Sequence, residues 1–411
     1  MILSDFLVIG AGIIGINVAR ELKNLFPDTR VILIEKEKGC GAHASTRNSG
    51  VLHAGFYYSS DSLKAKFTRN GNKLLTEYCD FNHIPVNKCG KLVVAKDLSE
   101  HHNLDELLKR GRTNRIELED VTEDEAVSIE PRVKTCGRAI YSPTTSSVNP
   151  HKVMRSMVCD AVKTGVEVHR GVCFLRKTVR GILTSSGTYQ AGYIVNTAGL
   201  YADSIAREFG FSRNYRILPF KGLYLYSDEP VGSIQTNIYP VPNLRNPFLG
   251  VHFTITADGK TKIGPTAIPA FWRENYHGLD GFDFRELVDI FTREVCLVAS
   301  STFDFKKLAL EEFNKYRRFR MVSLASSLVK GVKTKHYKRW GVPGIRAQLV
   351  DIKAQKLEMD FVVEGDNKSI HILNAVSPGF TCSIPFSKYI CKEINQRGKN
   401  ESSDSCRGAW H

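Results

Sequence analysis

The first thirty-six residues of the chain constrain its fold more than any other segment. Leu3–Ile9 is apolar and strand-like, the glycine-rich turn Gly10–Gly15 follows directly, and Ile16–Leu25 has the spacing of a helix. A second apolar strand, Arg30–Ile34, runs into the acidic residue Glu35. Strand, turn, helix and acid in this order form the dinucleotide-binding fingerprint in its required context. We therefore predict an α/β fold that begins with a Rossmann-like unit.

The glycines and the acid of this motif each have a physical role. Gly10 permits the tight turn, Gly12 lets a pyrophosphate approach the backbone, and Gly15 lets helix and strand pack closely. The phosphates then face the helix N-terminus. Glu35 lies where a carboxylate accepts hydrogen bonds from the ribose hydroxyls of adenosine, and it would repel the 2′-phosphate of NADP.

The chain is long enough for two domains. It has 411 residues, of which 42% are hydrophobic and 24% charged, and no apolar run approaches the ~18 residues of a membrane span. The first core strand starts at the N-terminus, so we expect neither a signal nor a transit peptide, and a cytoplasmic location. The ten cysteines are scattered, without a CxxC pair or a His/Cys cluster at zinc spacing. We interpret them as reduced thiols and expect no metal site.

The rest of the chain predicts a discontinuous nucleotide-binding domain with a second domain inserted in it. Ile194–Gly199 reads as a buried strand that ends in small residues before a helix near Tyr201. A last strand-to-helix unit runs from Ile370–Asn374 through Ser377–Gly379 into Ile384–Ile394. Short β-branched runs between these segments indicate an α+β substrate or cap domain on a mixed or antiparallel sheet. The predicted bounds are 1–85, 140–215 and 340–397 for the nucleotide-binding domain, 86–139 and 216–339 for the substrate domain, and 398–411 for a disordered tail.

The net charge of +14 is concentrated locally. Residues 306–340 carry eleven Lys or Arg and only two acidic residues, and Met321–Val332 within them has apolar residues at helical spacing. One interpretation is a basic amphipathic helix that lies on an anionic membrane surface. The other, which we favour, is a solvated basic face whose apolar side packs on its own domain. Nucleic-acid binding is not expected, because no recognisable nucleic-acid module accompanies the charge.

A second motif lies at Arg47–Tyr58, which reads RNSGVLHAGFYY. It resembles the (H)NSGV(I/L)HAGxYY signature of the L-2-hydroxyglutarate dehydrogenase/oxidase family, a branch of the D-amino-acid-oxidase-like FAD enzymes. The resemblance extends to about residue 397 and includes SLKA at 62–65, CGKL at 89–92, FLGVH at 248–252, GP at 264–265 and GIRAQ at 344–348. It implies non-covalently bound FAD in the Rossmann-like domain and oxidation of a 2-hydroxy dicarboxylate to its 2-oxo acid.

That reaction needs a base for the hydroxyl proton while the α-hydride is transferred to flavin N5, and a neutral imidazole suits this role. We interpret His53 as the base, because it lies on the loop after the Asn48–Gly50 segment that should pass beside the flavin. The alternative is a histidine that is satisfied structurally in the turn. His252, at a strand end, is interpreted as a second substrate contact or as the base itself, with a plain core histidine as the alternative.

Substrate carboxylates need cations that stay charged in a closed pocket, and the arginine fork binds both carboxylate oxygens. Arg346 is the first candidate, with a structural salt bridge as the alternative, and Lys221 is the second. Tyr57 and Tyr224 are expected to close the pocket or to donate hydroxyl hydrogen bonds. Further cofactor contacts are expected from Ile14, Lys36, Thr46, Asn48, Ser49, Gly50, Val172, Ala198, Gly199 and Gly379.

Two regions depart from the family pattern. The usual P-F-R-G-E-Y stands here as Pro219–Tyr224, with Lys221 in place of arginine and Leu223 in place of glutamate. A bidentate clamp is replaced by a point charge, so selectivity for the five-carbon diacid does not follow from the resemblance alone. The family's histidine before Asn-Ser-Gly is Arg47 here, and a permanent cation near the flavin would raise the flavin potential if the side chain points inward.

Together these features predict an FAD-dependent 2-hydroxy-acid dehydrogenase that acts on L-2-hydroxyglutarate. Its electrons are expected to pass to membrane quinone or to oxygen, and a basic amphipathic surface, peripheral on the inner face of the membrane, would suit quinone. One alternative is oxidation of amino acids, amines or glycerol 3-phosphate on the same scaffold, which the NSGVLHAG and GIRAQ stretches disfavour. The other is a flavin-binding assembly factor without turnover, which His53 and Arg346 disfavour.

Overall fold

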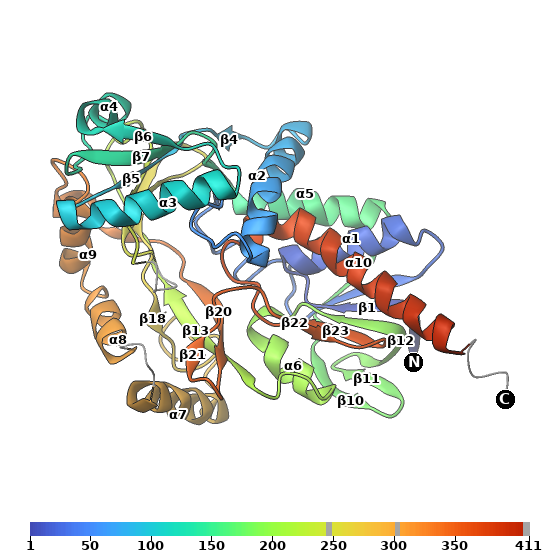
Figure 1. Ribbon diagram of the computed structural model, residues 1–411. Coiled ribbons are helices and arrows are strands. Elements are labelled where there is room, and N and C mark those ends of the chain that lie inside the picture. The colour runs from blue at the N-terminus through green and yellow to red at the C-terminus, as the bar shows by residue number, and fades with distance from the viewer. Residues whose placement is uncertain (244–248, 301–304, 406–411) are drawn as a thin grey trace.

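The computed structural model describes residues 1–243, 249–300 and 305–405, which fold around two large sheets (Figure 1). The strands of the first sheet are β1 (Ile2–Ile9), β2 (Val31–Glu35), β9 (Glu167–Arg170), β10 (Phe174–Thr178), β11 (Gly181–Thr184), β12 (Gly187–Asn196), β22 (Val363–Gly365) and β23 (Ser369–Ile372). Its parallel core has the order β9-β2-β1-β12-β23, to which β10, β11 and β22 add antiparallel strands. The core strands therefore come from three separate parts of the chain.

Both faces of this sheet are buried. Leu7 and Ile9 of β1 pack in one apolar cluster with Ile205 of α6 (Ala202–Glu208), whereas Val8 between them packs in the cluster on the opposite face. Four helices contribute to the apolar cluster on that opposite face, and in Figure 1 they lie together on one side of this sheet. They are α1 (Ile13–Leu25), α2 (Leu63–Phe81), α5 (Pro150–Lys163) and α10 (Gly379–Ser405). Helices on both faces of a parallel sheet confirm the predicted Rossmann-like arrangement.

The second large sheet belongs to the inserted part of the chain. Its strands, in spatial order, are β19 (Arg339–Trp340), β14 (Leu225–Tyr226), β17 (Thr261–Gly264), β16 (His252–Ile255), β15 (Asn237–Pro240), β5 (Lys91–Val94), β7 (Arg138–Ser142) and β6 (Glu119–Thr122). All neighbours are antiparallel except β5 and β15, which run parallel. The predicted α/β class with an α+β domain on a mixed sheet is confirmed.

Two smaller sheets connect these parts. The first has the order β18 (Ile268–Pro269), β13 (Tyr215–Gly222), β20 (Gly344–Asp351) and β21 (Lys356–Leu357). The second has the order β3 (Val51–Leu52), β8 (Ser146–Val148) and β4 (Val86–Asn87). In Figure 1 the four-stranded sheet lies between the two large ones.

The strands and helices can be compared with the predicted domain bounds, which themselves stay a prediction. Strand β7 crosses the bound placed at residue 140 and belongs to the second sheet. Strand β20 pairs with β13, so the start of the segment 340–397 joins the four-stranded sheet. Helix α10 continues to Ser405, over residues that the sequence predicted as a disordered tail, and 406–411 lie outside the described residues.

The basic segment near residue 320 packs on its own domain. Helix α9 (Arg318–Ser326) ends earlier than the periodicity of Met321–Val332 predicted. Five apolar residues of α9 and of the segment after it are 0–3% exposed in the core beneath the second sheet, namely Met321, Val322, Ala325, Leu328 and Val329, whereas Phe319 at the start of α9 is exposed. These side chains are therefore not available to a membrane, in agreement with the favoured interpretation.

The remaining helices lie around the second domain. They are α3 (His101–Thr113), α4 (Glu123–Ile129), α7 (Phe284–Ser300) and α8 (Phe305–Asn314). Helices α7, α8 and α9 follow one another along one edge of the molecule in Figure 1. Within the described ranges, no helix combines the length and the apolar character needed to cross a bilayer.

Candidate active site

The turn between β1 and α1 has the geometry of a phosphate cradle. Gly10 has a φ of +102°, which L side chains rarely adopt, and a Cβ on Gly15 would lie 2.0 Å from the Gly10 carbonyl oxygen. Gly12 is the N-cap residue of α1 and lines the cavity described below. The first turn of α1 contains no acidic residue, so the positive end of its dipole is left for a phosphate group.

Glu35, at the end of β2, is buried beside this turn. One of its carboxylate oxygens accepts the N–H of Ala11 at 2.8 Å, and the other accepts the N–H of Glu37 at 3.0 Å. Each oxygen keeps a second lone pair, and Glu35 lines the cavity, so it remains an acceptor for ribose hydroxyls. The neighbouring Lys36 forms ion pairs with Glu37 at 2.6 Å and with Glu274 at 2.5 Å. The residues present therefore fit an adenine dinucleotide without a 2′-phosphate.

A continuous cavity of about 1170 Å³ runs from this turn to the second sheet. It exceeds the ~300–1,000 Å³ of an ordinary small-molecule pocket, as a dinucleotide plus a substrate requires. The predicted cofactor residues that line it are Gly10, Gly12, Ile14, Glu35, Lys36, Asn48, Ser49, Val172, Ala198, Gly199 and Gly379.

Three predicted cofactor residues do not line this cavity. Gly15 packs against the end of β1, as its closeness to Gly10 shows. The hydroxyl of Thr46 donates to the Gly41 carbonyl oxygen at 2.7 Å. Gly50 has a φ of +79°, and a Cβ there would lie 2.4 Å from the carbonyl oxygen of Val148. These residues shape the backbone around the cavity.

His53 follows β3 and lines the cavity. Its backbone N–H donates to the Thr381 hydroxyl at 3.2 Å, and its ring Nδ1 has no hydrogen-bond partner among the described residues. Burial, with a smaller contribution from the charge of Lys91, lowers the pKa of His53 to about 3. The imidazole is therefore neutral at physiological pH and has an unpaired ring nitrogen.

His252 begins β16 and lines the same cavity. Its ring stacks on Tyr239 with centroids 3.6 Å apart, and its Nδ1 lies 2.9 Å from the Gly250 carbonyl oxygen. A carbonyl only accepts, so Nδ1 carries the proton and Nε2 is left as a proton acceptor. Burial and then the charge of Lys91 hold the pKa of His252 well below its ordinary value.

Arg346, on β20, lines the cavity together with Tyr57 and Tyr224. Its Nη1 donates to the Thr266 carbonyl oxygen at 3.2 Å. Lys221 lies on the other face of this sheet from Arg346. It pairs with Ile345, the neighbour of Arg346 on β20, and successive strand residues point to opposite faces. Its Nζ donates to Asn275 Oδ1 at 3.2 Å, away from the cavity lining.

Arg47, which replaces the family's histidine, also lines the cavity. Its guanidinium lies 4.2 Å above the centroid of the Tyr276 ring, and its Nε donates to the Ala42 carbonyl oxygen at 2.8 Å. The cation is thus held next to the Asn48–Gly50 segment.

Sequence reasoning missed Lys91, which does not line the cavity but packs against two residues that do, Tyr57 and Tyr239. Lys91 begins β5 and is fully buried, and its Nζ has no hydrogen-bond partner among the described residues. The Nζ lies 4.6, 5.0 and 5.2 Å from the ring centroids of Tyr239, Tyr57 and Phe56. Burial lowers the pKa of Lys91 to about 7. A lysine inside the apolar run Lys91–Val94 was the available sequence signal, but its histidine neighbours come from distant segments.

Two further buried lysines flank the cavity. Lys64 lines it, and burial lowers the pKa of this lysine to about 8. The Nζ of Lys262 donates to the Ser49 carbonyl oxygen at 3.0 Å and lies 4.5 Å from the Tyr224 ring centroid. Burial lowers the pKa of Lys262 to about 8 as well. The site is therefore richer in cations than the sequence predicted, which suits an anionic substrate.

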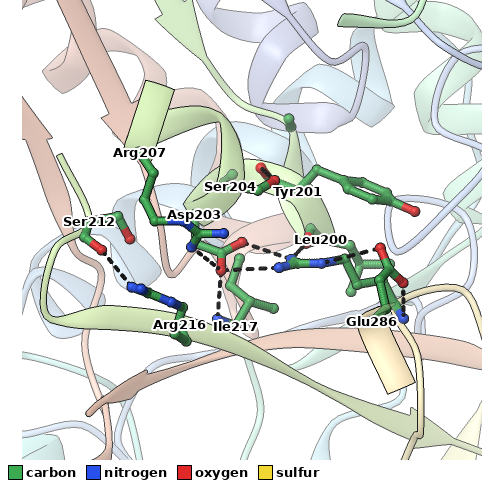
Figure 2. Close-up of polar contacts among 12 residues, drawn as sticks. Leu200, Tyr201, Asp203, Ser204, Arg207, Ser212, Arg216, Ile217 and Glu286 are labelled. Carbon is green, nitrogen blue, oxygen red and sulfur yellow. Dashed lines mark hydrogen bonds and ion pairs between the residues drawn. The ribbon is translucent and has the colours of Figure 1, made fainter. Parts of the chain in front are cut away.

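A buried ion pair holds one wall of the cavity in place. Asp203 of α6, at the centre of the contacts in Figure 2, accepts hydrogen bonds from Nη1 and Nη2 of Arg273, at 2.7 and 3.1 Å. It also accepts from Arg207 at 3.1 Å and from the N–H of Ile217 at 3.2 Å. Burial alone would raise the pKa of Asp203, but the two arginines outweigh it and hold the pKa below its ordinary value. The loop before α7 is thereby attached to the Rossmann-like domain.

Comparison with known proteins agrees with this geometry. The profile of the family described as "FAD dependent oxidoreductase" matches residues 5–391. The L-2-hydroxyglutarate dehydrogenase of Escherichia coli K12 is 32% identical, with 95% of this chain and 93% of that protein covered. The mitochondrial L-2-hydroxyglutarate dehydrogenase of Nematostella vectensis is 34% identical, with 96% of this chain and 91% of that protein covered.

Solved structures show the same fold at lower identity. L-alpha-glycerophosphate oxidase from Mycoplasma pneumoniae, with FAD bound, superposes with a TM-score of 0.75 at 20% identity, covering 96% of this chain and 95% of that one. Glycine oxidase from Geobacillus kaustophilus superposes with a TM-score of 0.73 at 17% identity, covering 97% of this chain and 96% of that one. The glycine-rich turn and the Glu35 carboxylate are arranged for a dinucleotide, and the family profile matches nearly the whole length of the chain. The chain therefore belongs to the FAD dependent oxidoreductase family, and its cofactor is FAD.

Proposed function

We propose that this protein oxidises L-2-hydroxyglutarate to 2-oxoglutarate with FAD. The observation that carries the proposal is the convergence of two neutral histidines and Arg346 on the cavity that contains the dinucleotide cradle. The relatives named above support the coarser statement, FAD-dependent oxidation of a 2-hydroxy acid. The cation-rich wall supports a dicarboxylate as the substrate.

The cations of the cavity have different roles in this proposal. Arg346 binds one carboxylate through its planar fork, and Lys64, which also lines the cavity, attracts the other. Tyr57 and Tyr224 donate hydroxyl hydrogen bonds to the bound diacid. The change from arginine to Lys221 does not remove a clamp from the cavity, because Lys221 does not line it.

The hydroxyl proton of the substrate is transferred to a histidine. His53 and His252 are both neutral, and His252 offers Nε2 as the acceptor. The negative charge of a bound diacid raises the pKa of a nearby imidazole, so the base becomes stronger when the substrate is present. FAD held in this cavity would supply the acceptor for the hydride of the α-carbon.

The final electron acceptor is membrane quinone or oxygen in this proposal. Comparing turnover of the FAD-loaded enzyme with a quinone analogue and with oxygen alone separates these two. Hydrogen peroxide formed at the rate of substrate oxidation would identify an oxidase.

Anaerobic reduction of the bound flavin tests the proposal directly. Addition of L-2-hydroxyglutarate is expected to bleach the oxidised flavin absorbance rapidly, whereas the D-enantiomer leaves it unchanged. A yellow protein that no 2-hydroxy acid bleaches would contradict the proposal and favour a flavin-binding protein without turnover.

The same scaffold supports one rival activity. Glycerol phosphate and amino acids are the substrates named for the structural neighbours, which share only the fold. A panel of L-2-hydroxyglutarate, glycerol 3-phosphate, glycine and L-proline, read by flavin bleaching, distinguishes them. Faster bleaching by an amine or by glycerol phosphate would overturn the substrate assignment.

A further inference from the structure

Arg110 is a cation of the active-site cavity to which the reaction described above assigns no role. It belongs to the last turn of α3 and lines the cavity together with Tyr57, Tyr58 and Lys64. Arg110 reaches the cavity from the inserted part of the chain, whereas Lys64 comes from α2, which packs on the parallel sheet. Two positive side chains from different parts of the fold therefore meet at one end of the cavity.

Core packing places α3 next to the segment that follows the histidine of β3. Leu104, Leu107 and Leu108 of α3 are buried, and their spacing puts them on one face of the helix. They share one apolar cluster with Phe56 and Tyr57 and with residues of β5 and β7, on which α3 lies in Figure 1. The position of α3 relative to the backbone at Phe56 and Tyr57 is therefore determined by the core.

Hydrogen bonds attach the end of α3 to the same backbone. Arg110 Nη1 donates to the Tyr57 carbonyl oxygen at 2.9 Å, and Asn114 Nδ2, at the C-cap of α3, donates to the Tyr58 carbonyl oxygen at 3.0 Å. Arg110 Nε donates to Glu106 Oε1, one turn earlier, at 2.8 Å. Arg110 Nη2 has no hydrogen-bond partner among the described residues. The guanidinium is thus held on two sides and keeps N–H donors for a ligand.

Lys64 adds a second positive charge at this end of the cavity. Its Nζ lies 5.9 Å from the ring centroid of Tyr58 and has no hydrogen-bond partner within the part of the chain that the structure describes. Asp360, which also lines the cavity, accepts three backbone N–H groups. Glu106 is partly exposed, so water screens its charge. The N–H donors of Lys64 and Arg110 are therefore left for an anion in the cavity.

We propose that Arg110 binds the distal carboxylate of a dicarboxylate substrate and so selects diacids over 2-hydroxy monocarboxylic acids. Arg346, on β20, holds the carboxylate next to the reacting hydroxyl, and Arg110 donates from Nη2 to the carboxylate at the other end of the substrate. Lys64 adds positive charge there, but an ammonium lacks the fixed donor geometry of a guanidinium. This assignment rests on the proposed function, because it names the residue that recognises the substrate class of the same site.

Binding of unreactive acids to the FAD-loaded full chain tests this role without turnover. The probes are glutarate, with two carboxylates, and pentanoate, which has the same chain length and one, and the readout is the change in visible flavin absorbance. The wild type should bind glutarate more tightly. Arg110→Gln should weaken glutarate binding about 10- to 100-fold, the worth of a hydrogen bond to a charged group, and leave pentanoate binding unchanged within about twofold. The matched control is Arg112→Gln, at an exposed arginine that does not line the cavity, and it should bind both acids as the wild type does.

Kinetics give a second readout. With L-2-hydroxyglutarate, Arg110→Gln should raise KM and change kcat little, and with (S)-2-hydroxypentanoate, which lacks the distal carboxylate, kcat/KM should stay as in the wild type. Arg110→Lys keeps the charge without the fork and should be intermediate, so it remains informative if Arg110→Gln does not fold.

Three results would overturn the proposal: no preference for glutarate in the wild type, unchanged glutarate binding in Arg110→Gln, or an equal loss with both hydroxy acids. The last would show that Arg110 only supports the Tyr57 backbone. The proposed function fails separately. Glutarate binding that Arg110→Gln weakens, in a protein that L-2-hydroxyglutarate does not bleach, would support the dicarboxylate site and count against the proposed function alone.

Discussion

At the scale of single residues, the site depends on histidines that are kept neutral. His53 and His252 reach one cavity from segments almost two hundred residues apart, and burial lowers the pKa of both. An imidazole that is already deprotonated can accept the hydroxyl proton without first losing its own. Which of the two takes the proton can be decided by substitution.

His53→Asn and His252→Asn are predicted to retain bound FAD, because neither side chain belongs to the glycine cradle. Loss of the general base should lower kcat by about 10²–10⁴-fold, whereas loss of a substrate contact should mainly raise KM. Steady-state kinetics with absorbance-based flavin content checks both variants. Near-wild-type kcat in either variant would exclude that histidine as the base.

Lys91 is predicted to set the pH range of activity. Its protonated form, which predominates below pH about 7, helps to lower the pKa of His53 and His252. In Lys91→Met that charge is absent, so both histidine pKa values should rise toward 6.5, and the acid limb of kcat/KM should move to higher pH. The matched control is Lys88→Met, at an exposed lysine three residues earlier. An acid limb that does not move would show that Lys91 has no electrostatic role.

At the scale of elements, local patterns predicted the structure where the relevant contacts are also local. The predicted strand Leu3–Ile9 and helix Ile16–Leu25 correspond to β1, which starts one residue earlier, and α1, which starts three residues earlier. The turn and its glycines determine this unit within a few residues of sequence. The sequence did not predict which face of the sheet Lys221 occupies relative to Arg346. That depends on the register of β13 against β20, which lies more than one hundred residues further along the chain.

The same limit applies to the helices. Periodicity predicted an apolar face near Met321, but whether it meets lipid or its own core depends on tertiary packing, and the core buries it. The second, exposed apolar face of α7 likewise becomes evident only from the structure, because the fold decides which face of the helix is covered. Lys91 was missed for the same reason, because its histidine neighbours are assembled only by the fold.

The link between α6 and the loop before α7 should be a sensitive point of stability. Arg273→Met leaves Asp203 fully buried with only Arg207 as its ionic partner, so the free energy of unfolding should fall by about 3–5 kcal/mol. Denaturant unfolding measures this. The double variant Asp203→Asn/Arg273→Met should recover part of the loss, because the fully buried side chain at position 203 is then no longer charged. Lys260→Met, which breaks the exposed pair with Asp258, should cost less than about 1 kcal/mol.

At the scale of the whole molecule, one cavity joins parts that otherwise have separate cores. Its lining comes from the parallel sheet, from the second sheet at His252 and from the four-stranded sheet at Arg346. The main apolar clusters of the two large sheets share no residue. A ligand that fills the cavity contacts residues of both large sheets, so its binding energy should stabilise the two sheets together.

Removal of FAD is accordingly predicted to lower the Tm of the entire protein. Free FAD at about 100 times its Kd adds about 2.7 kcal/mol to the folded state, and this energy is lost on removal. Calorimetry of apo and FAD-loaded protein should show a lower Tm without FAD, and restoration when FAD is added back. Gly12→Val, which places a side chain where the pyrophosphate approaches, should melt at the same temperature with and without FAD. A Tm shift confined to one of two separate transitions would show that the cavity does not couple the domains.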